Sequence, residues 1–347
     1  MTFRWSLTCF LLLINSISLA QTVIKNSEPR LAAGLVAQLL ARGGAGSPSD
    51  QFLLGQAFAK GQGVRQDLAQ AAAWYRRAAD RGEPGAITEI GRMYAEGSGM
   101  HQDYHQALMW FRRAAADGYA PAQQNLGLMY FQGLGARPDP RAAVMWWGKA
   151  AEQGLAEAES NLGVAYFTGT GVEKDSSRAA QLFRKAAKSG LVNAQFNLGY
   201  CYEHGEGVGQ DLGDAVRWYR SAADQGYAPA QTNLGALYQE GRGVAQDPRE
   251  ALRLFALAAD GGNSKALISL GQAYYRGLGV DRNVAIAYKW LEAAALSGEN
   301  VAEVIEIVSR ALGPSEISEA QRQARVWIAD HETFLKLNLL SSIVSAR

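Results

Sequence analysis

Cysteine is almost absent from this chain, which has two, Cys9 and Cys201. Cys9 lies in the apolar stretch near the N-terminus, and its removal with that stretch would leave Cys201 without a partner. A secreted chain with one cysteine has no internal disulfide. We therefore expect Cys201 to be a buried apolar residue, with a reactive thiol as the alternative.

Histidine is also scarce, with four in the chain, and this restricts metal and acid–base chemistry. His101 and His105 have the i, i+4 spacing of a faint metal motif, but Asp103 between them is expected to cap a helix. A zinc site needs three or four converging ligands. No Ser/His/Asp grouping or carboxylate pair recurs along the chain. The sequence therefore predicts no catalytic residue, no metal and no cofactor, although groups that converge only in space are not visible in a sequence.

An excess of one charge is missing too, because 34 lysines and arginines face 33 aspartates and glutamates. This balance excludes a general attraction to nucleic acid. A local basic row recurs at one place in the repeat described below: Arg76, Arg77, Arg112, Arg113, Lys149, Arg184, Lys185 and Arg220. We interpret the row as a solvated outer face, and binding of an anionic partner is the alternative.

The apolar run at the N-terminus is short. Arg4 precedes it, and residues 5–14 are too few to span a bilayer as a stable anchor. Ser18 and Ala20 supply small side chains at the positions that signal peptidase reads. Residues 1–20 are therefore predicted to be a signal peptide cut after Ala20, which would place the protein in the periplasm or outside the cell. An uncleaved N-terminal anchor is the alternative.

Glycine, in contrast, is abundant and regularly spaced. Seven glycines recur every 36 residues: Gly55, Gly91, Gly127, Gly163, Gly199, Gly235 and Gly271. A Gly-x-Gly loop, an Asp or Asn, a Trp or Leu and an Ala-Ala pair keep the same period. Self-similarity at this period indicates a stack of supersecondary units that bury their apolar faces against one another.

Each unit is predicted to be a pair of helices, a first helix A and a second helix B. Ala122, Leu126 and Tyr130 recur every fourth position, as on one face of a helix. Asp67 and its equivalents are placed to cap helix B, and Gln70, Gln106 and Glu250 complete a capping box in their repeats. Helix B is expected to bury a stripe of Ala, Trp or Leu, and Ala-Ala. The fold class is therefore all-α, a right-handed α-solenoid of about fourteen repeat helices.

The repeats are expected over residues 50–298, with capping segments at 21–49 and 299–347. A helix is predicted over residues 29–42, and Pro48 is suited to the start of the first repeat helix. Beyond 298 the period decays, and a last helix is expected to start near Ser318. The apolar segment 334–344 is interpreted as packing on the last repeat, with contact to a membrane surface or a partner as the alternative.

One repeat shows the pattern nearly whole, with Leu198-Gly199, Tyr202, Gly205, Asp211 and Trp218-Tyr219 in register. This pattern resembles the Sel-one-like repeat family of the tetratricopeptide-like superfamily, and the resemblance covers residues 50–298. It implies a non-catalytic protein-interaction scaffold, often periplasmic or secreted in bacteria. One branch of the family has a cysteine pair in each repeat, and β-lactam binding or hydrolysis is attributed to it. This chain lacks those pairs, so that activity is not carried over to it. A cell-wall or β-lactam-related role, by binding or hydrolysis, is the alternative function.

If helix A lines the concave side, as in tetratricopeptide relatives, the positions opposite its core stripe form the binding groove. Four consecutive repeats place asparagine there, and apolar side chains lie beside it: Asn125, Asn161, Asn197, Asn233, Leu128, Val164, Tyr200, Phe131 and Phe167. An asparagine offers both a donor and an acceptor, so it can pair with an extended peptide backbone. The predicted partner is a protein or peptide. The alternative is that these asparagines bond only within or between helices.

Overall fold

The computed structural model describes residues 29–42 and 46–345, and the side chains of residues 33–42 and 46–331. The predicted signal peptide and Cys9 lie outside the described residues.

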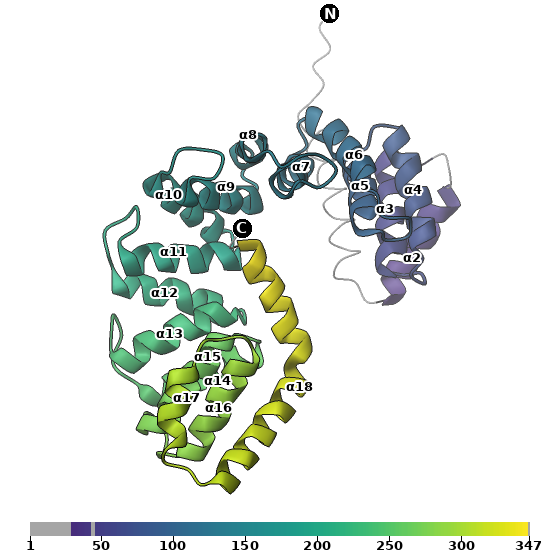
Figure 1. The fold of residues 1–347 in the computed structure, drawn as a ribbon. Coiled ribbons are helices and arrows are strands. Elements are labelled where there is room, and N and C mark those ends of the chain that lie inside the picture. Colours follow the sequence, from purple (N-terminus) through teal and green to yellow (C-terminus); the bar gives the residue numbers. More distant parts are fainter. Residues whose placement is uncertain (1–28, 43–45, 346–347) are drawn as a thin grey trace, which may run out of the picture. The chain divides into compact units, whose positions relative to one another are not determined.

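The chain divides into two compact units after Lys174, and Figure 1 labels their helices. The first unit contains α2 (Pro29–Arg42), α3 (Pro48–Lys60), α4 (Leu68–Asp80), α5 (Pro84–Glu96), α6 (Tyr104–Ala116), α7 (Ala120–Gln132), α8 (Pro140–Glu152) and α9 (Ala156–Thr168). The second contains α10 (Ser176–Lys188), α11 (Val192–His204), α12 (Leu212–Ala223), α13 (Ala228–Glu240), α14 (Pro248–Asp260), α15 (Ser264–Arg276), α16 (Val284–Leu296), α17 (Ala302–Ser309) and α18 (Pro314–Ser345).

Helices α3 to α16 are the repeat helices, in which odd numbers are helix A and even numbers are helix B. Helix A packs on the helix B that follows it, as α3 does on α4 in the first unit and α11 on α12 in the second. Every regular element of the described residues is a helix. The protein is thus an all-α solenoid with fourteen repeat helices, as the sequence predicts.

The start of helix B is fixed by the side chain of an Asp or Asn at the N-cap. Asp67 accepts a hydrogen bond from the backbone N–H of Gln70 at 3.0 Å, and each later repeat has the same bond. This bond satisfies one of the backbone donors that a helix start leaves free. The reciprocal bond of a capping box is found instead at α3, between Ser47 and Asp50.

The regularly spaced glycines lie inside helix A, where helix B approaches most closely. A Cβ on Gly199 would lie 2.7 Å from Cδ1 of Tyr219, and one on Gly91 would lie 2.8 Å from Cε1 of Phe111. Real Cβ atoms essentially never come that close to another heavy atom. The period of glycine is therefore a period of close helix contact.

The large residue that fills each repeat is the one after the predicted Trp or Leu, which corrects the expected stripe. These residues are all buried: Tyr75, Phe111, Trp147, Phe183, Tyr219, Phe255 and Leu291. The Trp or Leu before them is buried only at Trp74 and Leu254 and is half-buried elsewhere. Helical geometry explains the difference. Ala71, Tyr75 and Ala78 form an i, i+4, i+7 row, and a residue at i+3 lies toward the edge of that row.

From the second repeat on, the second glycine of each loop contacts the preceding repeat. Gly207 has a φ of +72°, and a Cβ there would overlap the backbone carbonyl of Ser176, the first residue of α10. An L-residue with a side chain is strained in this left-handed conformation. The loop glycines therefore set the spacing between repeats as well as the turn.

The two ends are closed by helices outside the repeats. Val36 and Leu39 of α2 are buried against Leu53 and Leu54 of α3, while Leu40 is 39% exposed. At the other end α18 packs on α16 (Figure 1). None of the described helices combines the length and apolar character needed to cross a membrane.

Helix α18 begins at Pro314 and not near Ser318, which corrects the predicted start. The Ser318 hydroxyl donates to the Pro314 carbonyl at 2.9 Å from inside the helix, and the Glu316 carboxylate accepts from the Gly313 N–H at 2.9 Å. Proline suits a first helical position because it has no N–H to satisfy. Side chains beyond 331 lie outside the description, so the packing of segment 334–344 stays a prediction.

Candidate functional site

The exposed side of helix A has the same layout in both units, and we call it the helix-A face. In the first unit Leu128 of α7 and Val164 of α9 are 37% and 40% exposed. Asn125 and Asn161 lie half-buried one helical turn before them. In the second unit Asn197 is half-buried on α11, and Asn233 on α13. The structure thus places all four asparagines on this face, two in each unit.

The four asparagines differ in their bonding. The Asn233 amide donates to the Tyr219 hydroxyl at 3.1 Å, so it has a structural partner. Among the described residues, the side chains of Asn125, Asn161 and Asn197 have no hydrogen-bond partner. The alternative interpretation of the asparagines as internal bonds therefore applies to Asn233, while the other three present free amide groups.

The three predicted aromatic residues lie on helix A and have neighbours that the structure shows. Phe131 packs against Trp147 with ring centroids 5.4 Å apart. Phe167 has the Lys174 ammonium 5.6 Å from its ring centroid. Tyr200 stacks on His204 at 4.1 Å. All three aromatic residues keep part of their surface open to solvent.

Between α11 and α13 a buried hydroxyl completes a polar network. The Tyr219 hydroxyl donates to the Glu203 carboxylate at 2.8 Å, and Arg242 lies 3.5 Å from the same carboxylate. Burial, and next the negative charge of Glu203, raise the pKa of Tyr219. The hydroxyl therefore stays protonated and acts as a fixed donor.

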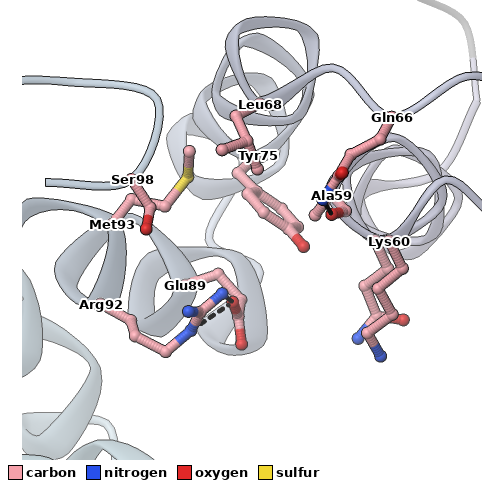
Figure 2. A pocket seen from close by; sticks show the side chains of 10 residues that line it. Ala59, Lys60, Gln66, Leu68, Tyr75, Glu89, Arg92, Met93 and Ser98 are labelled. Atoms are coloured by element: carbon pink, nitrogen blue, oxygen red, sulfur yellow. Dashed lines mark hydrogen bonds and ion pairs between the residues drawn. The ribbon is translucent and has the colours of Figure 1, made fainter. Parts of the chain in front are cut away.

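A pocket occupies the corresponding place between α3, α4 and α5 in the first unit. Its volume is about 410 Å³, and its lining includes Gln56, Ala59, Lys60, Tyr75, Glu89 and Arg92. Figure 2 shows the Tyr75 hydroxyl pointing into the space between Lys60 and the Glu89–Arg92 pair. Tyr75 is only 1% exposed, and burial together with Glu89 raises its pKa.

Sequence reasoning missed this pocket. The signal that could have located it lies at the position directly after the Trp or Leu of helix B. Among the seven repeats, only Tyr75 and Tyr219 carry a hydroxyl at this position. A phenol at that position extends past the helix A glycine to the helix-A face, where Phe and Leu end without a polar group.

The basic row on helix B contributes to the packing between repeats. The Arg112 guanidinium donates to the Tyr130 hydroxyl at 2.7 Å, and Arg184 donates to Tyr202 at 3.0 Å. Arg220 and Tyr238 make the same bond at 2.6 Å. In each pair the arginine belongs to one repeat and the tyrosine to helix A of the next. These bonds favour the interpretation of the row as an ordinary outer face.

The sequence offers two candidates for chemistry, the Cys201 thiol and the metal-like spacing of His101 and His105. Cys201 is fully buried in α11, as expected, and burial raises the pKa of its thiol to about 12. The thiol is therefore protonated at neutral pH and unsuited to nucleophilic attack. In the described part of the chain, no three His, Cys, Asp or Glu side chains come together as a metal site.

Seven pairs of helices with a repeated core define the class of protein, an α-solenoid. The family model described as the Sel1 repeat matches seven successive stretches, 48–83, 84–119, 120–155, 156–191, 192–227, 228–263 and 264–299. The chain therefore belongs to the Sel1 repeat family, which confirms the resemblance seen in the sequence. Such scaffolds are generally non-catalytic and typical of protein–protein interaction.

One solved structure agrees with this assignment, and a second is reported as a similar chain. A Sel1 repeat protein from Oxalobacter formigenes is 33% identical with a TM-score of 0.64, covering 70% of this chain and 96% of that one. A protective antigen of uropathogenic Escherichia coli with an SLR fold is 25% identical with a TM-score of 0.48, covering 93% of this chain and 97% of that one. No curated protein matches the chain.

Proposed function

We propose that this Sel1 repeat protein is a non-catalytic adaptor of the periplasm or the secreted space that holds a protein or peptide on its helix-A face. The carrying observation is the pairing of exposed apolar side chains with amide groups that have no internal partner. In the first unit Leu128 and Val164 offer apolar contact, and Asn125 and Asn161 offer hydrogen bonds beside it. In the second unit Asn197 offers a further amide group on the helix-A face. A bound peptide uses both kinds of contact, because its backbone groups need hydrogen-bond partners when they leave water and its apolar side chains need apolar contact.

Location and partner class rest on the sequence. Residues 1–20 have the charge, the apolar run and the small residues of a signal peptide. The balanced net charge argues for a protein or peptide partner over nucleic acid. Mass spectrometry of the protein from its own host tests the location, since a mature N-terminus at Gln21 is expected.

The direct test replaces Asn161 and Asn197 by alanine and measures partner capture from an envelope extract of the source cell. Both amides lack internal partners, so we expect at least a tenfold loss of capture, from about two lost hydrogen bonds, with a melting temperature that holds within a few degrees. Asn233→Ala is the matched control, because it breaks the bond to Tyr219 and is expected to lower stability instead. Unchanged capture by the double variant, or collapse of its fold, contradicts the proposal.

A further inference from the structure

We propose that the pocket between α3, α4 and α5 binds a carboxylate of the partner, either an acidic side chain or the terminal carboxylate of a peptide. The inference rests on the proposed function, because it names the chemistry of one group that the helix-A face takes. The pocket lies within the first unit, and its volume of about 410 Å³ is at the small end for ligand sites. It therefore suits one side chain of a larger partner.

The equivalent place four repeats later shows what fills such a pocket. The repeat is 36 residues long, so each pocket residue has a counterpart. The counterparts of Gln56, Ala59, Tyr75, Glu89 and Ser98 are Tyr200, Glu203, Tyr219, Asn233 and Arg242. In the second unit larger side chains thus replace three of the residues that leave the first pocket open.

The decisive difference between the two places is that Ala59 stands where the later repeat has Glu203. Where Glu203 supplies a carboxylate, the Tyr219 hydroxyl donates to it at 2.8 Å, and Arg242 adds a positive charge 3.5 Å away. Ala59 supplies only a methyl group. Among the described residues the Tyr75 hydroxyl has no hydrogen-bond partner, although Tyr75 is 1% exposed. The hydroxyl faces the pocket with a donor that no protein group uses, and a carboxylate entering from outside would accept a hydrogen bond from it.

The charges that line the pocket favour an anion. Arg92 is held by Glu89 at 2.7 Å and by Glu96 at 2.6 Å, so its charge is already engaged by two carboxylates of the protein. Lys60 is exposed and makes no ion pair with any residue that the structure describes. Lys60 is therefore the cation available to a guest carboxylate, in the role that Arg242 has for Glu203.

The test uses short peptides and protein labelled with isotopes on its tyrosine rings. One peptide has a single central glutamate and is blocked at both ends, a second has glutamine instead, and a third has alanine with a free terminal carboxylate. Binding is followed by the NMR signal of Tyr75, assigned with Tyr75→Phe. We expect the glutamate peptide to move this signal and the glutamine peptide to bind about tenfold more weakly. The third peptide tells whether a terminal carboxylate is accepted as well. The Tyr219 signal should stay unchanged, because its site already holds Glu203.

Ala59→Glu is the informative variant, because it copies the arrangement of Glu203 into the first unit. It should abolish the response of Tyr75 to the peptides while the melting temperature is maintained. Ala95→Glu adds the same charge at the equivalent position of the next repeat and should leave the response intact. Equal binding of the glutamate and glutamine peptides, no binding of any carboxylate peptide, or an unchanged response in Ala59→Glu would each overturn the proposal.

These outcomes are separate from the test of the proposed function. A protein that captures its partner through Asn161 and Asn197, while Tyr75 ignores carboxylates, disproves only the pocket. A protein whose Tyr75 responds to carboxylates but which captures no partner disproves the adaptor function and leaves a carboxylate site.

Discussion

Replacing Gly207 by alanine is expected to destabilise the second unit by about 3 kcal/mol, of which roughly half comes from the left-handed backbone and half from overpacking. Gly207 has a φ of +72°, and the new Cβ would overlap the backbone of Ser176. A backbone carbonyl at the start of α10 has no freedom to rotate away, in contrast to the end of a flexible side chain. The measurement is the midpoint of urea unfolding followed by circular dichroism.

Two neighbouring glycines separate these causes. Gly226 has a φ of +83° with no heavy atom within 4 Å of a built Cβ, so Gly226→Ala should show the backbone penalty alone, about 1–2 kcal/mol. Gly209 has no positive φ and equally open space, and its replacement should change the free energy of unfolding by less than about 0.5 kcal/mol. If the three variants unfold at the same midpoint, the loop glycines do not set the spacing between repeats.

Replacing Phe111 by alanine is expected to cost about 3–5 kcal/mol, the usual cost of removing a fully buried aromatic ring. Phe111 is 2% exposed, and its ring lies against Gly91 in the core of the first unit. Trp110→Ala is the matched comparison. Trp110 is half-buried, and Arg76 and Arg113 lie 4.9 Å and 5.6 Å from its ring centroid.

Trp110 is thus at the edge of the core, and its loss should cost about 1–2 kcal/mol, from partial burial and weak cation–π contact. Thermal and urea unfolding of both variants show which of the two is less stable. A Trp110 variant that is less stable than the Phe111 variant would restore the sequence-based assignment of Trp as the main core residue.

The sequence was sufficient to predict the helix pairs because each repeat carries its own stop and start signals. Gly133 in the left-handed conformation ends α7, and Asp139 begins α8 one loop later. These signals are local, so the chain displays them directly. The start of α18 at Pro314 was missed because Ser318 has the residue type of an N-cap, and only the observed bond to Pro314 places it inside the helix.

The choice between adjacent positions on helix B could not be made from periodicity. Trp110 and Phe111 are both large and apolar, and the fit against Gly91 in the folded chain decides which of them is buried. The asparagine positions were readable from the period, but their bonding was not. Asn233 has a partner because Tyr219 carries a hydroxyl, whereas Asn125 and Asn161 follow Phe111 and Trp147 and lack that partner.

The pocket depends on the same long-range information. The space beside Ala59 is also bordered by Gln56 of the same helix and by Ser98, which follows α5, and Ser98 is far from Ala59 in the sequence. A comparison of repeats within the chain could point to the position, since Glu203 replaces Ala59 in the same register. It could not show that the Tyr75 hydroxyl faces open space.

The central claim is that the partner binds on the helix-A face, and photo-cross-linking from single positions tests it most directly. A photoreactive residue is introduced separately at Leu128 and Val164 on helix A and at Met109 and Met145 on helix B. All four side chains are exposed, by 37%, 40%, 62% and 48%. The proposed function predicts that one and the same partner is cross-linked from Leu128 and Val164 and not from the two methionine positions. Cross-linking of that partner from Met109 and Met145, with none from helix A, would contradict it.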